Sequence, residues 1–256
     1  MERVAGLPAL LRHRRLILLA GLGLSILVST GVGAFPLKQA TSQLASRAAT
    51  CSTLADSVPG ASGHGELLTV IAPSARSTTA VFQMYRWAGT CFESVAGPFA
   101  AFVGINGVSA RHREGDRTTP IGLFGIKTTM YGVEANPGLT YRYHQFRCGD
   151  WWDEDPQTVL YNHFVHVTCG TAPPFAGNSE SLWTKVPAYD YLAVINFNTS
   201  PVVPGRGSAI FLHVSKGSPT TGCVSIAQVH LLRVLELLRT ALHPVIYINT
   251  RAALPA

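Results

Sequence analysis

The sequence predicts a mainly β fold with one principal helix late in the chain. Most of the chain consists of short runs rich in β-branched and aromatic residues, separated by Gly, Pro and Asn at turn positions. Residues 227–242 instead show a helical apolar period, and one face carries Val229, Leu232, Leu235, Leu238 and Leu242. Runs of strands followed by a single helix are typical of a mainly β domain, which we place at residues 66–250.

The N-terminal region resembles a targeting segment. Three arginines at positions 12–15 precede an apolar run at 16–28, followed by small residues before Phe35. This order is typical of an export signal, although the run is close to the roughly 20 residues that span a bilayer. We therefore expect residues 1–34 to be a signal peptide or an uncleaved N-terminal membrane anchor. Residues 35–65, rich in Ala, Ser, Thr and Gly, read as a linker.

The first half of the domain is expected to form strands at 66–71, 79–87, 91–95 and 99–105. The last of these ends at Asn106-Gly107, a strong tight-turn signal.

The second half begins with an expected strand at 123–127, after which residues 131–181 show no clear period. Two adjacent tryptophans there, Trp151 and Trp152, either line a groove for a peptide or sugar or cap the sheet. Further strands are expected at 189–196, 208–214 and 245–249, which surround the helix in sequence.

The centre of the chemistry is expected between His213 and Cys223. His213 closes an apolar strand, a Gly-Ser-Pro turn follows, and Cys223 precedes the helical pattern, whose capping-box spacing is Ser225 to Gln228. A cysteine at a helix N-terminus has a lowered thiol pKa, and a nearby imidazole can take its proton. The alternative is a buried structural cysteine. We expect no metal site, because no third and fourth ligand lie at close spacing.

Three segments resemble the L,D-transpeptidase family of the YkuD (ErfK/YbiS) type. His213 followed by Thr220-Thr221-Gly222-Cys223-Val224-Ser225 is similar to its catalytic signature. The segment 114–126 resembles Gly-Asp-x-x-Thr-Pro-x-Gly-x-Phe-x-Ile, and 152–162 resembles Trp-x-x-Asp-Pro…Tyr-Asn. The common family form is Ser-His-Gly-Cys-x-Arg, so Thr221 stands for a His and Ser225 for an Arg.

The resemblance implies a YkuD-like β-sandwich with the principal helix after the catalytic cysteine. It implies Cys223 as nucleophile and His213 as base, with the backbone N–H groups of Gly222 and Cys223, aided by Thr221, as oxyanion hole. It also implies no cofactor. Residues expected to line the substrate groove are Ser215, Thr220, Trp152, Tyr161 and Asn162.

All five cysteines follow the apolar N-terminal run, which fits an oxidising compartment. Because the motif needs a free Cys223 thiol, the other four can pair in three ways. A Cys148–Cys169 bridge would close a loop of about 20 residues, worth roughly 3 kcal/mol in the loop-entropy model. Cys51 would then pair with Cys91 and tie the linker to the first strands.

The charge pattern gives no indication of a nucleic-acid partner. The net charge is +6, and half of it comes from the first 15 residues, which hold four Arg and one Glu. There is no Lys/Arg stripe interleaved with aromatic residues.

The expected function is that of an exported, cell-wall cysteine acyltransferase that cross-links peptidoglycan stem peptides through a Cys223 thioester. The alternatives are an L,D-carboxypeptidase, with water as acceptor, and a non-catalytic wall-binding domain on the same fold. A membrane contact is expected only through an uncleaved N-terminal segment.

Overall fold

The computed structural model describes residues 53–177 and 179–254, and this part of the chain is mainly β, as predicted. The expected signal or anchor at 1–34 lies outside the described residues, as does most of the expected linker. Within them, no helix is long and apolar enough to cross a membrane.

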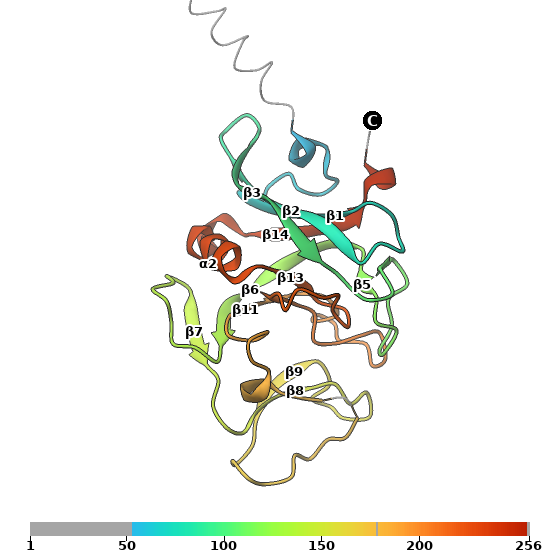
Figure 1. The fold of residues 1–256 in the computed structure, drawn as a ribbon, viewed down its shortest axis with the longest axis vertical. Coiled ribbons are helices and arrows are strands. Elements are labelled where there is room, and N and C mark those ends of the chain that lie inside the picture. Colours follow the sequence, from blue (N-terminus) through green and yellow to red (C-terminus); the bar gives the residue numbers. More distant parts are fainter. Residues whose placement is uncertain (1–52, 178, 255–256) are drawn as a thin grey trace, which may run out of the picture. The chain divides into compact units, whose positions relative to one another are not determined.

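One large sheet organises the fold (Figure 1). In the described part of the chain, eight strands pair in the order β11-β12-β13-β3-β2-β1-β14-β6, and β6 also pairs with β11, which closes a barrel-like ring. β7 lies beside β6. The bounds are β1 Glu66–Ala72, β2 Thr79–Trp87, β3 Phe92–Phe102, β6 Gly122–Gly132, β7 Arg142–Gln145, β11 Leu192–Ile195, β12 Phe211–Val214, β13 Val224–Ile226 and β14 Val245–Thr250.

The closed ring differs from the two separate sheets of the expected sandwich, and the length of β6 is the reason. The first part of this strand, Gly122–Gly125, pairs with β14, and residues from Ile126 to Tyr131 pair with β11. The strand thereby joins the two ends of the sheet. Closure pairs the edge strands with each other, which removes the open edges that an unclosed sheet would carry.

The interior of the ring holds the main hydrophobic cluster, to which nearly every strand contributes. Helix α2, Gln228–Leu237, adds its buried face to this cluster: Leu231, Val234, Leu235 and Leu238. The predicted helix is confirmed, but it ends earlier and its buried face is rotated. Val229, placed on the core face by the sequence pattern, is 68% exposed. The observed set has the same helical spacing, so periodicity alone did not distinguish the two faces.

Two strands expected at 91–95 and 99–105 form the single strand β3. A Gly97-Pro98 step interrupts the sequence pattern but not the strand. Opposite it, the pairing of β3 with β2 shifts register between Phe82 and Met84. Such a bulge accommodates a proline, which cannot donate to the ladder.

The predicted position of Cys223 at a helix N-terminus is wrong. Strand β13 follows Cys223 directly, and α2 begins only at Gln228. Ser225, expected to cap the helix, lies within β13, and Ala227 takes the N-cap position without a side-chain hydrogen bond. The three-residue strand is long enough to pair with β12 and β3, and this pairing overrides the capping pattern.

Residues 131–181, which showed no sequence period, contain a second, three-stranded sheet in the order β10-β8-β9. Its strands are β8 Asp150–Asp153, β9 His163–His166 and β10 Glu180–Ser181, followed by the 3-10 turn η2 at Leu182–Thr184. The predicted Cys148–Cys169 disulfide is present and links the start of β8 to the end of β9, with 5.2 Å between the Cα atoms. The predicted Cys51–Cys91 bridge involves Cys51, which lies outside the described residues, so that pairing stays a prediction.

The end of the expected linker belongs to the folded unit. The 3-10 turn η1, Leu54–Ser57, and the residues after it bury Ala55, Val58 and Ala61 against the outer face of β1 and β14. This layer explains why every residue of β1 is buried although its side chains alternate between two faces. Two further 3-10 turns flank β14, η3 at Thr240–Leu242 and η4 at Arg251–Ala253.

A two-stranded parallel ladder supports the loop that carries the Gly-Asp motif. Strand β4, Val108–Ser109, pairs with β5, Thr119–Pro120, and the nine residues between them form a loop. The Thr119 hydroxyl lies behind this loop, accepts the backbone N–H of Gly104 at 2.8 Å and donates to the Cys223 carbonyl at 3.1 Å. The ladder thereby connects the motif loop to Cys223.

Candidate active site

Strand alternation places the two predicted catalytic side chains on the same face of the sheet. In β12, Leu212 and Val214 enter the interior cluster, so Phe211 and His213 face outward. β13 runs parallel beside β12, with His213 opposite Ser225. Cys223, which precedes β13, shares the outward face and packs with Phe211 in a second hydrophobic cluster.

The Cys223 thiol is buried and protonated in this environment. Its side chain is 6% exposed, and its Sγ donates to the Ala209 carbonyl at 3.2 Å and accepts the Phe211 N–H at 3.4 Å. Burial raises the pKa of the thiol well above its usual range, and the charge of Glu180, with that of Glu154 once it ionises, raises it further, against the lowering effect of the Phe211 N–H. The low thiol pKa expected from the sequence is therefore not supported.

His213 is held in a single tautomer. The Nδ1 atom lies 2.8 Å from the Val214 carbonyl, which can only accept, so Nδ1 carries the proton and Nε2 is the unprotonated nitrogen. The Ala188 backbone makes a further hydrogen bond to the ring. The Tyr189 ring packs edge-on against the imidazole, with 5.5 Å between ring centroids. Burial is the main cause that lowers the pKa of His213 from 6.5 to about 4, so the ring is neutral at pH 7.

A cavity of about 310 Å³ brings His213, Cys223 and Ser225 together. Ser225 is 1% exposed, and its hydroxyl has no hydrogen-bond partner. Three more predicted residues near the cavity lie in the loop after β12. Thr220 and Thr221 line it, whereas the Ser215 hydroxyl accepts the Gly217 N–H at 3.0 Å and shapes the turn. The pocket thus contains the Cys223 thiol, the His213 imidazole and the Ser225 hydroxyl. Of these three, the Ser225 hydroxyl makes no hydrogen bond within the described protein.

The expected oxyanion hole is only partly available. The Gly222 N–H donates to the Thr220 hydroxyl at 3.2 Å, and this hydroxyl donates in turn to the Cys223 carbonyl at 2.7 Å. The Gly222 N–H therefore already donates a hydrogen bond within the protein and is not free to bind an oxyanion. Thr221 is exposed and lines the cavity, so its hydroxyl remains open to a ligand.

A second cavity of about 370 Å³ adjoins the first, with which it shares Cys223, Thr221, Glu180, Lys185 and Tyr189, and it also contains Gly222. Its most prominent feature is a set of carboxylates, Glu114, Glu154 and Glu180. These side chains come from three separate segments of the chain: the Gly-Asp motif loop, the residue after β8, and β10. Glu114 begins the Gly-Asp segment and Glu154 belongs to an acidic run at 150–155, but no sequence motif assigns a site role to any of the three.

The carboxylates of this cavity differ in how they are satisfied. Glu180 accepts from the Tyr189 hydroxyl and lies 3.4 Å from the Lys185 ammonium. Glu154 has a buried Oε1 with no hydrogen-bond partner. Burial and the neighbouring carboxylates raise the pKa of Glu154 to about 9, so it is protonated at pH 7. The set of three acidic side chains in this cavity therefore carries less negative charge than three ionised carboxylates would.

Three predicted groove residues, Trp152, Tyr161 and Asn162, are buried and line neither cavity. Asn162 accepts from the Trp152 indole N–H at 3.0 Å and from the Ala209 N–H at 3.0 Å. Ala209 adopts a left-handed backbone with φ of 52°, and its carbonyl holds the Cys223 thiol. The segment that resembles the family's Trp…Tyr-Asn pattern therefore supports the cysteine from behind and does not contact the groove.

Tyr161 supports the second cavity in a similar way. Its hydroxyl donates to Glu114 and accepts the Gly207 N–H at 3.0 Å, and the Ser208 hydroxyl donates to the same Glu114 oxygen at 2.7 Å. These contacts fix the Glu114 carboxylate at the wall of the cavity.

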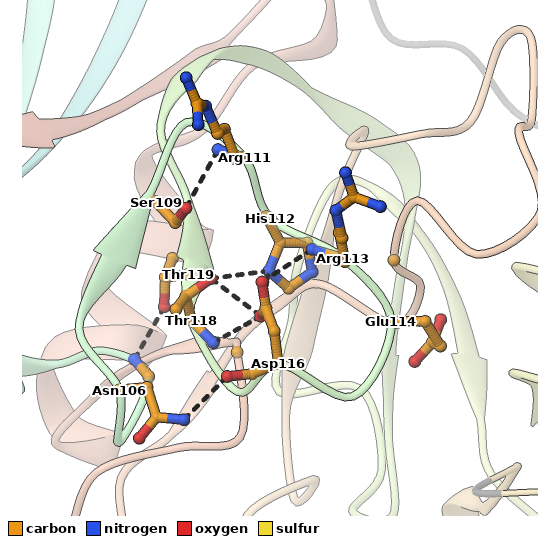
Figure 2. A network of polar contacts seen from close by, with 12 residues as sticks. Asn106, Ser109, Arg111, His112, Arg113, Glu114, Asp116, Thr118 and Thr119 are labelled. Carbon is orange, nitrogen blue, oxygen red and sulfur yellow. Dashed lines mark hydrogen bonds and ion pairs between the residues drawn. The ribbon is translucent and has the colours of Figure 1, made fainter.

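A further histidine, His112, lines the second cavity together with Cys223. Figure 2 shows its ring beside Asp116 and Thr118 in the motif loop. The sequence reasoning did not consider His112, although it lies two residues before the quoted Glu114–Ile126 segment. A histidine four residues before an aspartate in that loop was the available signal.

No family model, no curated protein and no solved structure matches this chain. Within the described residues, no group of three or more His, Cys, Asp and Glu side chains is arranged to hold a metal ion.

Proposed function

We propose that this protein is an exported cysteine acyltransferase of the L,D-transpeptidase type, which cross-links peptidoglycan stem peptides. One observation carries the proposal: Cys223, directly before β13, and the neutral imidazole of His213, in the neighbouring parallel strand β12, line the same cavity. This is the nucleophile-and-base pairing that the sequence motif predicts. The Cys148–Cys169 disulfide supports a site of action outside the cytoplasm.

In the first step, the Cys223 sulfur attacks the carbonyl between a diaminopimelate-type centre and a terminal D-residue. The thiol proton passes to Nε2 of His213, a tetrahedral intermediate forms, and the proton then goes to the departing amine as the C–N bond breaks. The product is a Cys223 thioester and a free D-amino acid.

The resting state of this pair is a neutral thiol and a neutral imidazole. The pKa of Cys223 is raised and that of His213 is lowered to about 4, so an ion pair does not form spontaneously. Proton transfer therefore accompanies attack on the bound carbonyl. The thiol must also exchange its hydrogen bond to the Ala209 carbonyl for one to His213.

The developing oxyanion requires donors near Cys223. Because the Gly222 N–H already donates to Thr220, the Thr221 hydroxyl and the Cys223 N–H are the proposed donors, with Ser225 as a further hydroxyl in the cavity. One such donor is worth roughly 3 kcal/mol in other enzymes. In the second step an acceptor amine attacks the thioester and forms the cross-link, whereas water as acceptor would give a carboxypeptidase.

A non-catalytic wall-binding domain is the second candidate, and the state of the thiol favours it. Cys223 is buried and protonated, its Sγ donates a hydrogen bond to a backbone carbonyl, and the Glu180 carboxylate raises its pKa. A domain that only binds the stem peptide needs the cavity but not the thiolate.

The decisive experiment incubates the protein with tetrapeptide muropeptides and analyses the products by mass spectrometry. We expect a cross-linked dimer that has lost one D-alanine, absent with Cys223→Ala. A shortened monomer alone would identify a carboxypeptidase. Unchanged muropeptides that are still retained by both wild type and Cys223→Ala would establish the binding domain, and turnover by Cys223→Ala would exclude the thioester.

A further inference from the structure

Two histidines from different elements line the two cavities that contain Cys223. His213 lines the first cavity, and His112, from the loop between β4 and β5, lines the second. Both cavities contain Cys223 and Thr221. A ligand group in the second cavity therefore lies near Cys223 in the company of His112, which does not line the first cavity.

A carboxylate orients the His112 ring, whereas the His213 ring is oriented by a backbone carbonyl. The Nδ1 atom of His112 lies 3.0 Å from Oδ1 of Asp116 and 3.1 Å from the Thr118 hydroxyl, and that hydroxyl donates to the same Asp116 oxygen at 2.9 Å. A carboxylate only accepts, so Nδ1 carries the proton and Nε2 is the basic nitrogen. His112 and Asp116 thus have the base-and-orienter arrangement of a catalytic dyad.

Asp116 is itself fixed as a carboxylate. It accepts backbone N–H groups from Arg113 and Thr118, each at 2.8 Å (Figure 2). Burial raises its pKa, but these hydrogen bonds, with those from the Thr118 hydroxyl and His112, lower it below the ordinary value overall. Burial lowers the pKa of His112, and the charges of Asp116 and Glu114 oppose this. The dyad at neutral pH is a neutral imidazole on an ionised aspartate.

Two glycines lie against the ring of His112. Gly207 packs tightly on the Nε2–Cδ2 edge, where a Cβ would lie 2.4 Å from Nε2, and a Cβ at Gly222 would lie 3.8 Å from Cε1. Both glycines have positive φ, at 113° and 150°. The Cε1 side of the ring therefore lies near Gly222, the residue before Cys223, and both His112 and Cys223 line the second cavity.

We propose that His112 is the general base for the acceptor in the second half-reaction, with Asp116 as its positioning residue. The inference rests on the proposed acyl transfer. The acceptor amine in the second cavity attacks the thioester carbonyl and passes its proton to Nε2 of His112. The C–S bond then breaks as the amide forms, and His112 returns the proton to the Cys223 sulfur. Each histidine thus serves one half-reaction from its own cavity.

The test separates the two half-reactions by mass spectrometry of the intact protein after mixing with tetrapeptide. In His112→Asn we expect the Cys223 thioester to form at the wild-type rate and then to accumulate, with turnover reduced at least about 100-fold, the usual contribution of a general base. His213→Ala should form no adduct. His230→Gln is the matched control, since His230 stacks on Phe99 and lines neither cavity.

Two further measurements distinguish catalysis from a structural effect. Hydroxylamine, a nucleophile that needs no base, should release the accumulated acyl group from His112→Asn. Asp116→Asn removes a charge that raises the pKa of His112, so the acid limb of the deacylation rate should move to lower pH. A merely destabilised protein would show neither result.

The outcomes are separable. Accumulation of the thioester with hydroxylamine release supports the inference. Wild-type turnover by His112→Asn overturns the inference about His112 and leaves the proposed function in place. The same holds if His112→Asn is folded, as shown by cooperative unfolding, but fails to form the thioester. Wild-type protein that forms neither adduct nor product overturns both.

Discussion

At the scale of single residues, the environment of Cys223 suppresses the reactivity of its thiol. The thiol donates to Ala209, is surrounded by apolar side chains and lies near the Glu180 carboxylate, which accepts a hydrogen bond from Tyr189. Each of these favours the protonated thiol over the thiolate. In the proposed acyl transfer, this thiol would react only when a base takes its proton as it attacks the bound substrate.

Glu180→Gln should therefore make the thiol more reactive. The change removes one negative charge near the sulfur and keeps the shape that binds Tyr189, so the pKa of Cys223 should fall. Below the thiol pKa, the thiolate fraction, and with it the alkylation rate by iodoacetamide at pH 8, should rise roughly tenfold for each pKa unit. The control is Glu134→Gln, an exposed carboxylate that lines neither cavity. Equal rates in wild type and Glu180→Gln would show that Glu180 does not act on the thiol.

At the scale of elements, the strands predicted most accurately are those in which a single run of β-favouring residues forms one whole strand. β1, β2 and β14 were found with nearly their observed bounds, because β-branched and aromatic residues bounded by turns are a local signal. Strands β8, β9 and β10 were missed, since they have two to four residues and exist only through pairing with one another. Strand β13 was missed for the same reason, and the sequence therefore did not reveal that a strand separates Cys223 from helix α2.

The candidate site was predictable to the same extent. His213 and Cys223 are ten positions apart on a recognisable motif, so the sequence identified them. Glu154 and Glu180 lie in the stretch without a period, and only the small sheet brings them to the thiol. Trp152 and Asn162 were recognised as a motif, but sequence could not reveal that they face the back of Ala209.

The Cys148–Cys169 disulfide joins two strands of the small sheet, and this gives a prediction at the element scale. Cys148 and Cys169 are separated by 21 positions, which in the loop-entropy model corresponds to roughly 3 kcal/mol of stabilisation. Replacing both by Ala should lower the thermal unfolding midpoint by several degrees, whereas Cys223→Ala, which breaks no disulfide, should cost less. Dithiothreitol should lower the midpoint of wild type by reducing this bridge, and this part of its effect should be missing from the double variant. An unchanged midpoint in the double variant would show that the sheet is held by its other contacts.

At the scale of the whole molecule, two buried groups give the stability opposite dependences on pH. The pKa of His213 is lowered from 6.5 to about 4, so the unfolded chain binds its proton first and stability falls as pH drops from 6.5 towards 4. The pKa of Glu154 is raised from 4.5 to about 9, so the unfolded chain releases its proton first. Its contribution is fully present below pH 4.5 and is lost as pH rises towards 9.

Glu154→Gln should consequently stabilise the protein at neutral pH. Gln keeps the size of the side chain but does not ionise in the unfolded state, so at pH 7 the gain in unfolding free energy is up to about 3 kcal/mol at 1.36 kcal/mol per pKa unit. The gain should shrink as the pH falls, be small at 4.5 and vanish well below it, where Glu154 is protonated in both states. Urea unfolding at pH 4.5, 6 and 8 measures this, with the exposed Glu93→Gln as control. A difference between Glu154→Gln and wild type that stays constant over this range would mean that Glu154 is ionised in the folded protein.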